Sequence, residues 1–440
     1  MRLRMNGTIP TSVLIMVAAL SVLAKLVSGH NLFLVLFLLV SCYGILKERT
    51  EDKIIFLLFF STWIYVLKFD GDRFSFFHII QFVYLLSCLF SMLNNKIRVS
   101  LTVIIGFLFF ALYILLTSGF ASSNNSLVIV GFLLNFLTIA VASATLNENA
   151  SYERYVLSYA SGLVFSGLVA LLGRWIPEVE QYIQNMGETY TLYENNHLYT
   201  RFSGLDVDPN YFSLQVLVAI ALLLVVSGYK KQLVKESVLI LVLAFMGLHT
   251  LSKMFLLMVI IILIYVCIIY VTSKYRSVMK YLFALTVLIL IAMPFGLLDF
   301  IVVTIARFSE QGGTVVSVTT GRSSLWVAYL QEITANPRIF LIGNGIGTGF
   351  LDGYAAHNMY LSYWYFTGFL GIVALLVFVA YSYNHMKKTT TGSIKMAKRA
   401  LNSLPLFVVI VANFSLDSIV MDFFPLVLFL SLLSLNHVKV

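Results

Sequence analysis

The sequence predicts an all-α polytopic membrane protein, with residues 1–440 forming a single integral membrane domain of about 12–14 transmembrane helices. Two observations indicate this class. Of the 440 residues, 60% are apolar and only 11% are charged, whereas a soluble domain of this length needs far more charge to cover its surface. Apolar runs of bilayer-spanning length also recur along the whole chain, and the charge-rich segments connect them. We therefore expect no separate soluble domain.

Polar residues divide the chain into about fourteen apolar runs, each of which is an expected span. The runs lie near residues 11–28, 31–46, 54–69, 76–94, 99–119, 126–146, 155–175, 211–229, 237–251, 254–272, 281–299, 358–382, 402–418 and 421–436. The alternative is about twelve crossings, because the short pairs at 11–46, 237–272 and 402–436 leave room for a re-entrant or interfacial segment. Arg2 and Arg4 precede the first run as in a signal peptide, but a second run follows at once, so we predict a retained first helix.

The basic residues follow the expected membrane topology. The formal net charge is +9, but lysines and arginines are distributed over alternating loops instead of gathering on one soluble face, which argues against nucleic-acid binding. With a cytoplasmic N-terminus, most of the 29 basic residues fall in cytoplasmic loops. We therefore expect both termini in the cytoplasm. We also expect few arginines on the outer face, so the presence of each one there requires an explanation.

Neither a metal site nor a disulfide is predicted. The three cysteines, Cys42, Cys88 and Cys267, lie inside apolar runs without metal-ligand spacing, which is typical of small buried apolar residues. Asp70 and Asp72 form a pattern typical of a turn, and no further ligands are spaced near them.

Two outer loops, residues 176–210 and 300–357, are long enough to carry function. The first ends directly before a predicted helix. Asp208 or Asn210 is expected to cap that helix, and Gly204 permits a bend that aims Arg201 back toward the membrane. The alternative is a plain capped helix start in which Arg201 pairs with a neighbouring aspartate.

The second loop contains an expected amphipathic helix on the outer membrane surface. Apolar residues recur at helical spacing from Leu325 to Ile333, and Asn336-Pro337 ends the pattern. Arg322 lies in the first turn, where a cation is poorly placed unless an anion binds there, because the macrodipole is already positive. The alternative is an arginine that reaches toward lipid headgroups.

His357 is the most informative residue of the second loop. It lies where the loop gives way to an expected membrane helix, and a titratable imidazole near outer arginines suggests chemistry on a lipid-linked phosphate. The glycine-rich run at 343–349 lacks a βαβ context and a Walker lysine, so it is not a nucleotide site. Its glycines are expected to let the backbone approach the bundle or a ligand closely. The alternative for His357 is a hydrogen-bonded structural role.

These motifs resemble the O-antigen polymerase and ligase superfamily, membrane glycosyltransferases of bacterial surface-polysaccharide assembly. The resemblance in the first loop rests on Arg201-Phe202-Ser203-Gly204 with Asp208-Pro209-Asn210. A more specific block spans residues 321–371 and contains Gly321-Arg322, Trp326, Asn336-Pro337, Gly343, Gly345, His357-Asn358, Tyr360-Leu361, Gly368 and Gly371. The N-terminal half is similar only in hydropathy.

The resemblance implies glycosyl transfer at the outer face of the bacterial cytoplasmic membrane, from a glycan on undecaprenyl pyrophosphate to an acceptor hydroxyl. It implies that His357 is the base and that loop arginines bind the pyrophosphate. Arg201 and Arg322 are the candidates. Lys253, at a short outer turn, stands where these proteins often have arginine; it is either a third cation or a snorkelling anchor. Four residues of the matching motifs are expected to support the site: Asp208, Asn210, Asn358 and Tyr360.

No metal, nucleotide or other cofactor is expected, because cations can neutralise a departing pyrophosphate whose charge is already delocalised. The expected partners are the undecaprenyl-pyrophosphate-linked oligosaccharide and membrane lipids, together with a chain-length regulator and a flippase, and no nucleic acid.

Three functions stay open. A polymerase, which Arg73-Phe74-Ser75 at an outer turn favours, transfers the glycan to a second lipid-linked repeat unit. A ligase transfers it to lipid A-core or to a protein. A transporter or flippase of lipid-linked glycans is the alternative from another class, and it predicts ionisable groups deep in the bilayer and interrupted helices in both halves.

Overall fold

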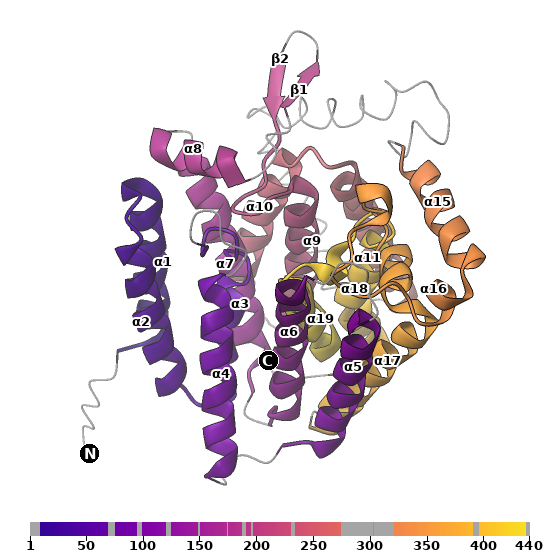
Figure 1. The fold of residues 1–440 in the computed structure, drawn as a ribbon. Helices are drawn as coiled ribbons and strands as arrows, with labels where there is room; N and C mark the ends of the chain where they lie inside the picture. Colours follow the sequence, from indigo (N-terminus) through magenta and orange to yellow (C-terminus); the bar gives the residue numbers. More distant parts are fainter. Residues whose placement is uncertain are drawn as a thin grey trace.

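The computed structural model is an all-α bundle, as predicted (Figure 1). It describes residues 9–68, 75–94, 99–119, 125–147, 150–173, 175–186, 191–194, 197–229, 234–273, 302, 321–389 and 396–436. Within these residues, seven helices are long and apolar enough to cross a membrane, as in a polytopic membrane protein. The expected span at 281–299, the turn with Asp70, Asp72 and Arg73, and most of residues 300–320 lie outside the described residues.

The elements fall into three groups. The long apolar helices are α1 (Thr11–Ser28), α4 (Phe76–Leu93), α5 (Leu101–Gly119), α6 (Ser126–Ala144), α7 (Tyr152–Leu172), α9 (Pro209–Ser227) and α17 (Met359–Thr389). Shorter apolar helices are α2 (Leu32–Lys47), α11 (Lys253–Ser273) and α19 (Phe424–Leu435). The remaining helices are α3 (Ile54–Phe60), α8 (Pro177–Met186), α10 (Val234–His249), α15 (Arg322–Ala335), α16 (Pro337–Leu341), α18 (Met396–Ala412), η2 (Leu351–Gly353) and η3 (Ser418–Val420). The segment between α8 and α9 adds an antiparallel hairpin of β1 (Thr191–Glu194) and β2 (His197–Thr200).

One predicted span is wrong. The run at 54–69 forms only the short helix α3, and residues 61–67 continue mostly in turns. The turns are buried, and side chains satisfy their backbone: the Ser75 hydroxyl donates to the carbonyls of Ile64 and Leu67 at 2.8 and 3.1 Å. A high hydropathy indicates that a segment is buried. It does not distinguish a spanning helix from buried turns whose backbone groups accept hydrogen bonds from side chains.

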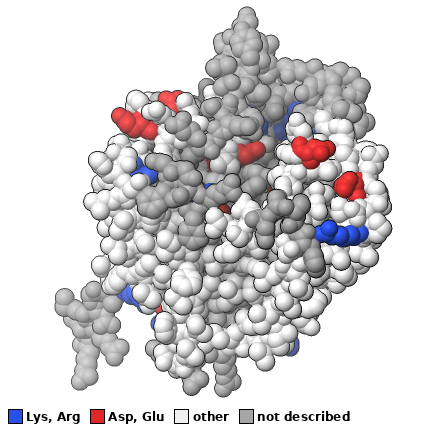
Figure 2. All heavy atoms as spheres, viewed as in Figure 1, with Lys and Arg blue, Asp and Glu red and all other residues white. Residues whose placement is uncertain are grey.

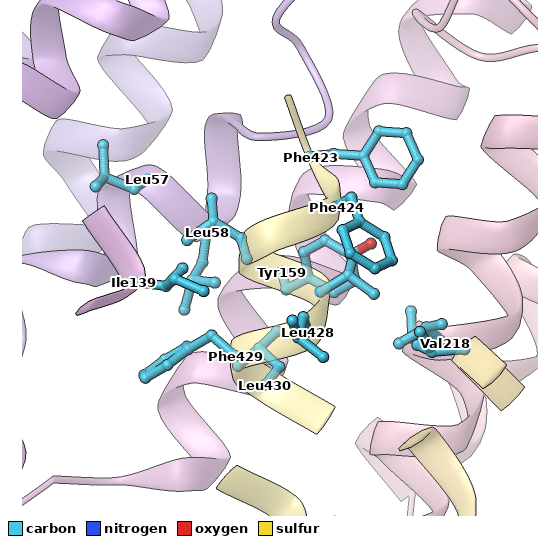
Figure 3. Packing of buried hydrophobic residues seen from close by; sticks show 14 of the residues in the cluster. Leu57, Leu58, Ile139, Tyr159, Val218, Phe423, Phe424, Leu428, Phe429 and Leu430 are labelled. Atoms are coloured by element: carbon cyan, nitrogen blue, oxygen red, sulfur yellow. The ribbon is translucent and has the colours of Figure 1, made fainter. Parts of the chain in front are cut away.

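The centre of the bundle is α9, which is 94% buried and packs against α7, α10, α11, α18 and α19. Its sequence is apolar on every side, as expected of a helix surrounded by other helices. Figure 3 shows Val218 of α9 with Tyr159 of α7 and Phe424 and Leu428 of α19 among the buried side chains. In a membrane, close packing rather than transfer from water holds such helices together.

Helix α17 is interrupted at Gly368, whose φ of 64° and ψ of −178° are not helical. The loop after α16 inserts there: the backbone N–H groups of Asn344 and Gly345 donate to the carbonyls of Tyr365 and Phe366 at 2.9 and 2.7 Å. The Tyr113 hydroxyl of α5 donates to the Thr367 carbonyl at 2.7 Å. The carbonyl groups freed by the interruption therefore have partners inside the protein, as a bilayer requires. The expected close approach of the glycine-rich run is confirmed.

Replacing Gly343 by alanine is expected to destabilise the protein. A Cβ atom there would lie 2.4 Å from the Phe366 carbonyl oxygen, and the φ of 86° is left-handed. Gly321→Ala is the matched control, because Gly321 has a φ of 81° but nothing within 4 Å of the added Cβ. That variant should be destabilised only by about 1–2 kcal/mol, the cost of a left-handed backbone for a residue with a Cβ atom. The apparent Tm in detergent should fall clearly more for Gly343→Ala, and equal shifts would contradict the packing explanation.

Candidate functional site

The first part of the site is the start of α9, which forms as predicted. Asp208 is the N-cap, and its carboxylate accepts the backbone N–H of Asn210 at 2.6 Å. Pro209 occupies the first turn, where its missing N–H costs nothing. The bend before the cap is made by Gly204, which has a φ of 61°. This local geometry turns residues 201–208 onto the end of α9.

Arg201 is bound at this end of α9. Its Nε donates to the Thr250 carbonyl at 3.0 Å and its terminal nitrogen donates to Asn210 Oδ1 at 2.9 Å. The hydroxyl of Ser252 donates to the same Asn210 oxygen at 2.9 Å. Lys253 follows as the first residue of α11, and its Nζ is buried. The two cations predicted from separate loops thus lie next to one junction of α9 with the turn between α10 and α11.

Asp206 adds a buried carboxyl group beside the cap. It accepts a hydrogen bond from the Gln215 side chain at 2.6 Å and a longer one, 3.4 Å, from the backbone N–H of Asp208. Burial raises the pKa of Asp206 to about 7, and the nearby Asp208 carboxylate adds to the rise, although the hydrogen bonds oppose it. The charge at this end of α9 therefore changes near neutral pH.

The second part of the site is α15, which begins at Arg322 as predicted. The helix is docked on the protein: the Trp326 indole donates to the Ala356 carbonyl at 2.9 Å, and the Tyr329 hydroxyl donates to the Tyr354 carbonyl at 2.8 Å. Tyr329 and Ile333 are its buried residues. The Arg322 guanidinium donates to the Ser415 carbonyl at 2.8 Å. It therefore points to the connection between α18 and α19 and not along the helix surface.

The turn into α17 contains His357, which has a left-handed φ of 48°. Asp417 holds this turn: its two oxygens accept the backbone N–H groups of His357 at 2.5 Å and Asn358 at 3.0 Å. The carboxylate also accepts the Ser362 hydroxyl. Asp417 is 0% exposed, and burial raises its pKa while these hydrogen bonds and the imidazole oppose the rise. A strained turn held by a buried carboxylate is typical of a functional site.

Sequence reasoning missed Asp417, because it lay inside the expected span at 402–418. Helix α18 ends at Ala412 instead, and α19 begins at Phe424, so the connection between them is longer than expected. The available signal was an acidic residue within an apolar run, which is costly in a membrane and usually functional.

Charges from three of these segments act on the His357 imidazole, those of Arg322, Asp417 and Asp208. Burial lowers the pKa of His357, the Arg322 guanidinium lowers it further, and the Asp417 and Asp208 carboxylates oppose both effects. Burial likewise lowers the pKa of Arg322, against the attraction of Asp208 and Asp417. The structure thus brings together residues about 150 positions apart in the chain. The lowered pKa favours the unprotonated form of the imidazole, which can accept a proton.

Two predicted supporting residues contact mainly the backbone. The Asn358 side chain accepts the backbone N–H groups of Tyr360 and Leu361 at 3.1 and 3.2 Å, so it caps the start of α17. The Tyr360 hydroxyl donates to the Ile410 carbonyl of α18 at 2.7 Å. Asn358 therefore stabilises the start of α17 beside His357, and Tyr360 links that start to α18.

The visible surface agrees with membrane insertion. In Figure 2, most of the coloured charged side chains on this face lie in its upper half, a few lie near its lower end, and uncharged residues cover most of the rest of the described surface. An uncharged surface is expected where helices face lipid.

Asp417→Asn is expected to destabilise the protein by about 1–3 kcal/mol, because an amide offers one acceptor oxygen where the carboxylate satisfies three donors. Asp352→Asn is the matched control, since Asp352 carries the same side chain in the same loop region but is exposed. Thermal unfolding in detergent measures both. A Tm shift for Asp417→Asn no larger than that of the control would contradict the proposed role of the carboxylate.

Arg322→Gln is expected to raise the pKa of His357, because the guanidinium is one of the causes that lower it. Reaction with diethyl pyrocarbonate requires neutral imidazole, and mass spectrometry can follow it at His357 as a function of pH. The midpoint should move to higher pH in the variant, while His385 near the other end of α17 provides an internal reference. An unchanged midpoint would show that the two groups are not coupled.

The chain is a helical multi-pass membrane protein with about seven candidate spans among its described residues. No protein-family model matches it, and no curated protein matches it.

Proposed function

We propose that the protein is a membrane glycosyltransferase that moves a glycan from a polyprenyl diphosphate, of the undecaprenyl type, to a sugar hydroxyl. One observation carries this proposal: the turn that holds His357 and the guanidinium of Arg322 are both bound to the connection between α18 and α19, through Asp417 and Ser415. Burial and the Arg322 charge lower the pKa of that imidazole. A base beside a cation suits a reaction in which a hydroxyl loses a proton while a phosphate departs.

In the proposed reaction, His357 accepts the proton of the acceptor hydroxyl as that oxygen attacks the anomeric carbon of the donor. The bond from this carbon to the diphosphate oxygen breaks, and the electron pair leaves with the diphosphate. Direct displacement inverts the anomeric centre. A depressed pKa suits the base, because the imidazole is then unprotonated over a wider range of pH.

The departing diphosphate needs positive charge rather than a strong acid. Arg322 and Arg201 are the proposed ligands, since a guanidinium binds phosphate oxygens through two parallel N–H bonds. Lys253 adds a third charge without that geometry. Arg201 is already oriented by Asn210 and Thr250, so little conformational freedom is lost on binding. The proposed reaction needs neither a nucleotide nor a metal ion.

The proposed acceptor is a second lipid-linked repeat unit at the outer face of the bacterial cytoplasmic membrane, which makes the protein a polysaccharide polymerase. A ligase acting on lipid A-core or protein is the alternative acceptor assignment. Gene deletion separates them: loss of a polymerase leaves single repeat units on the surface, whereas loss of a ligase leaves long chains on the carrier lipid.

His357→Asn is expected to reduce elongation of defined lipid-linked repeats by purified protein about 10²–10⁴-fold, the usual contribution of a general base. Asparagine is chosen because it tolerates the left-handed φ of 48°. Product length on a gel gives the rate, and His385→Asn in α17 controls for general damage. Wild-type elongation by His357→Asn, with Arg201→Ala and Arg322→Ala equally active, would refute the proposal.

A transporter of lipid-linked glycans is the second candidate, because α17 is interrupted at Gly368 and a His78–Asp422 pair lies between helices. Interrupted helices and buried ionisable groups are common in transporters. Purified protein in sealed vesicles would distinguish the two activities, since a transporter moves lipid-linked glycan across the bilayer without changing its length.

A further inference from the structure

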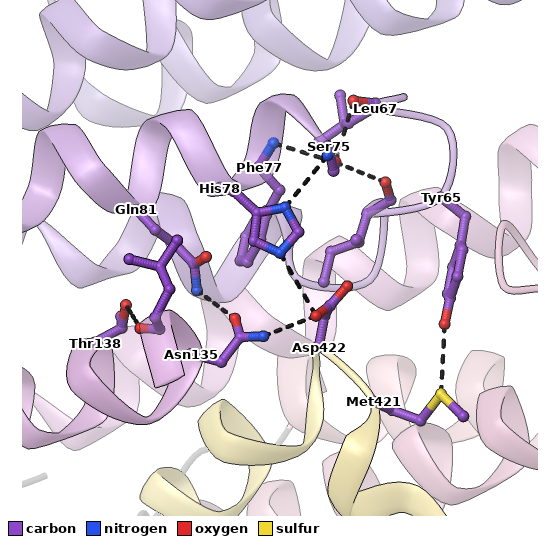
Figure 4. A network of polar contacts seen from close by, with 12 residues as sticks. Tyr65, Leu67, Ser75, Phe77, His78, Gln81, Asn135, Thr138, Met421 and Asp422 are labelled. Atoms are coloured by element: carbon purple, nitrogen blue, oxygen red, sulfur yellow. Dashed lines mark hydrogen bonds and ion pairs between the residues drawn. The ribbon is translucent and has the colours of Figure 1, made fainter. Parts of the chain in front are cut away.

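A second polar network lies at the first turns of α4, outside the site described above (Figure 4). The His78 Nε2 atom is 3.5 Å from Asp422 Oδ1, and the Asn135 side chain of α6 donates to that oxygen at 2.7 Å. Gln81 donates in turn to Asn135 at 2.7 Å. The His78 Nδ1 atom accepts the backbone N–H of Ser75 at 3.2 Å, which leaves Nε2 to carry the proton toward Asp422. The network therefore ties α4 and α6 to the segment before α19.

A groove of about 610 Å³ begins at this network and runs between α4 and α6. His78 is its polar end, and the rest of the lining is almost entirely apolar, including Leu86, Leu134 and Leu137. Side chains on its rim face outward from the bundle: Phe82 and Val130 are each 55% exposed. In a chain that spans a membrane, such a rim opens to the hydrocarbon of the bilayer.

The length of the groove limits its occupant. From His78 to Met92, helix α4 rises about 21 Å at about 1.5 Å per residue. One leaflet contributes only about 15 Å of hydrocarbon, half of a core of about 30 Å. The groove thus extends past the depth of one leaflet and has room for an extended hydrocarbon chain along its whole length.

The polar end of the groove adjoins the candidate site through one short segment. Asp422 and Asp417 both belong to the connection between α18 and α19, on either side of η3. The ring of Phe423 lies 6.2 Å from that of Tyr211, in the first turns of α9 after the Asp208 cap. A lipid chain that enters the groove at His78 therefore has its head near the residues proposed to bind diphosphate.

We propose that the groove between α4 and α6 holds the hydrocarbon chain of a long polyprenyl lipid, the carrier of one of the glycan substrates. This assignment rests on the proposed function for the identity of the lipid. The chain contributes binding energy by apolar contact along the groove, and the network at His78 fixes the end at which the head leaves it.

The test is photo-crosslinking of the full chain in nanodiscs with a diazirine-bearing long-chain polyprenyl phosphate. Labelled peptides should come from α4 and α6. Leu137→Trp fills the groove and should reduce labelling about tenfold, the effect of losing roughly two buried methylene groups. Leu127→Trp is the matched control on the same helix, because Leu127 is 55% exposed and does not line the groove. Labelling elsewhere, or equal labelling of the two variants, would overturn the proposal.

A competition experiment with the wild-type chain avoids any folding defect of the variants. Unlabelled long-chain polyprenyl phosphate should displace the probe, and a polyprenyl phosphate short enough to fit in one leaflet should compete about tenfold less well. Equal competition by the short lipid, or by dioleoyl phosphatidylglycerol, would show that an ordinary acyl chain occupies the groove and overturn the proposal. Because this readout needs no transfer, a labelled but inactive protein would count against the proposed function alone, and an active but unlabelled one against the groove alone.

Discussion

One buried carboxylate holds the candidate site in place. Asp417 accepts N–H or O–H donors from His357, Asn358 and Ser362, all of them in the turn into α17 or its first residues. Three donors stabilise a charge that burial alone would make costly. Because Asp417 follows α18 whereas its partners begin α17, the same contacts fix the two helix ends relative to each other. They also compensate the left-handed backbone of His357, which costs about 1–2 kcal/mol. The anchor also sets the His357 turn beside Ser415, whose carbonyl accepts a hydrogen bond from Arg322.

The chemistry of the site follows from the mixture of charges around that anchor. Asp208 caps α9, and Arg322 reaches from α15 to the carbonyl of Ser415. The three segments that meet here come from different parts of the chain, so a ligand that binds at their junction contacts the long loops and the bundle together. Such junctions are common places for binding sites. They also place a base and a cation in surroundings drier than the loops alone would provide, which strengthens every interaction between charges.

Local signals in the sequence predicted much of this arrangement. The cap at Asp208, the start of α15 at Arg322 and the close approach at Gly343 were all predictable, because caps, helical periodicity and glycine depend on neighbouring residues. The anchor at Asp417 and the network at Asp422 were not predicted. Each pairs with groups far away in the chain, and both lay in what hydropathy presents as one apolar region. The turns after α3 were mistaken for a helix for the same reason, since an apolar run reports burial and not backbone conformation.

The interruption of α17 has a consequence for biosynthesis. A helix that enters a bilayer with free carbonyl groups at Gly368 is unstable until those groups find donors. The donors, Asn344 and Gly345, precede α17 in the chain, and the Tyr113 hydroxyl belongs to the much earlier helix α5. These three donors are therefore synthesised before Gly368. Helix α17 can complete its hydrogen bonds as soon as it emerges from the ribosome, before the C-terminal helices are made.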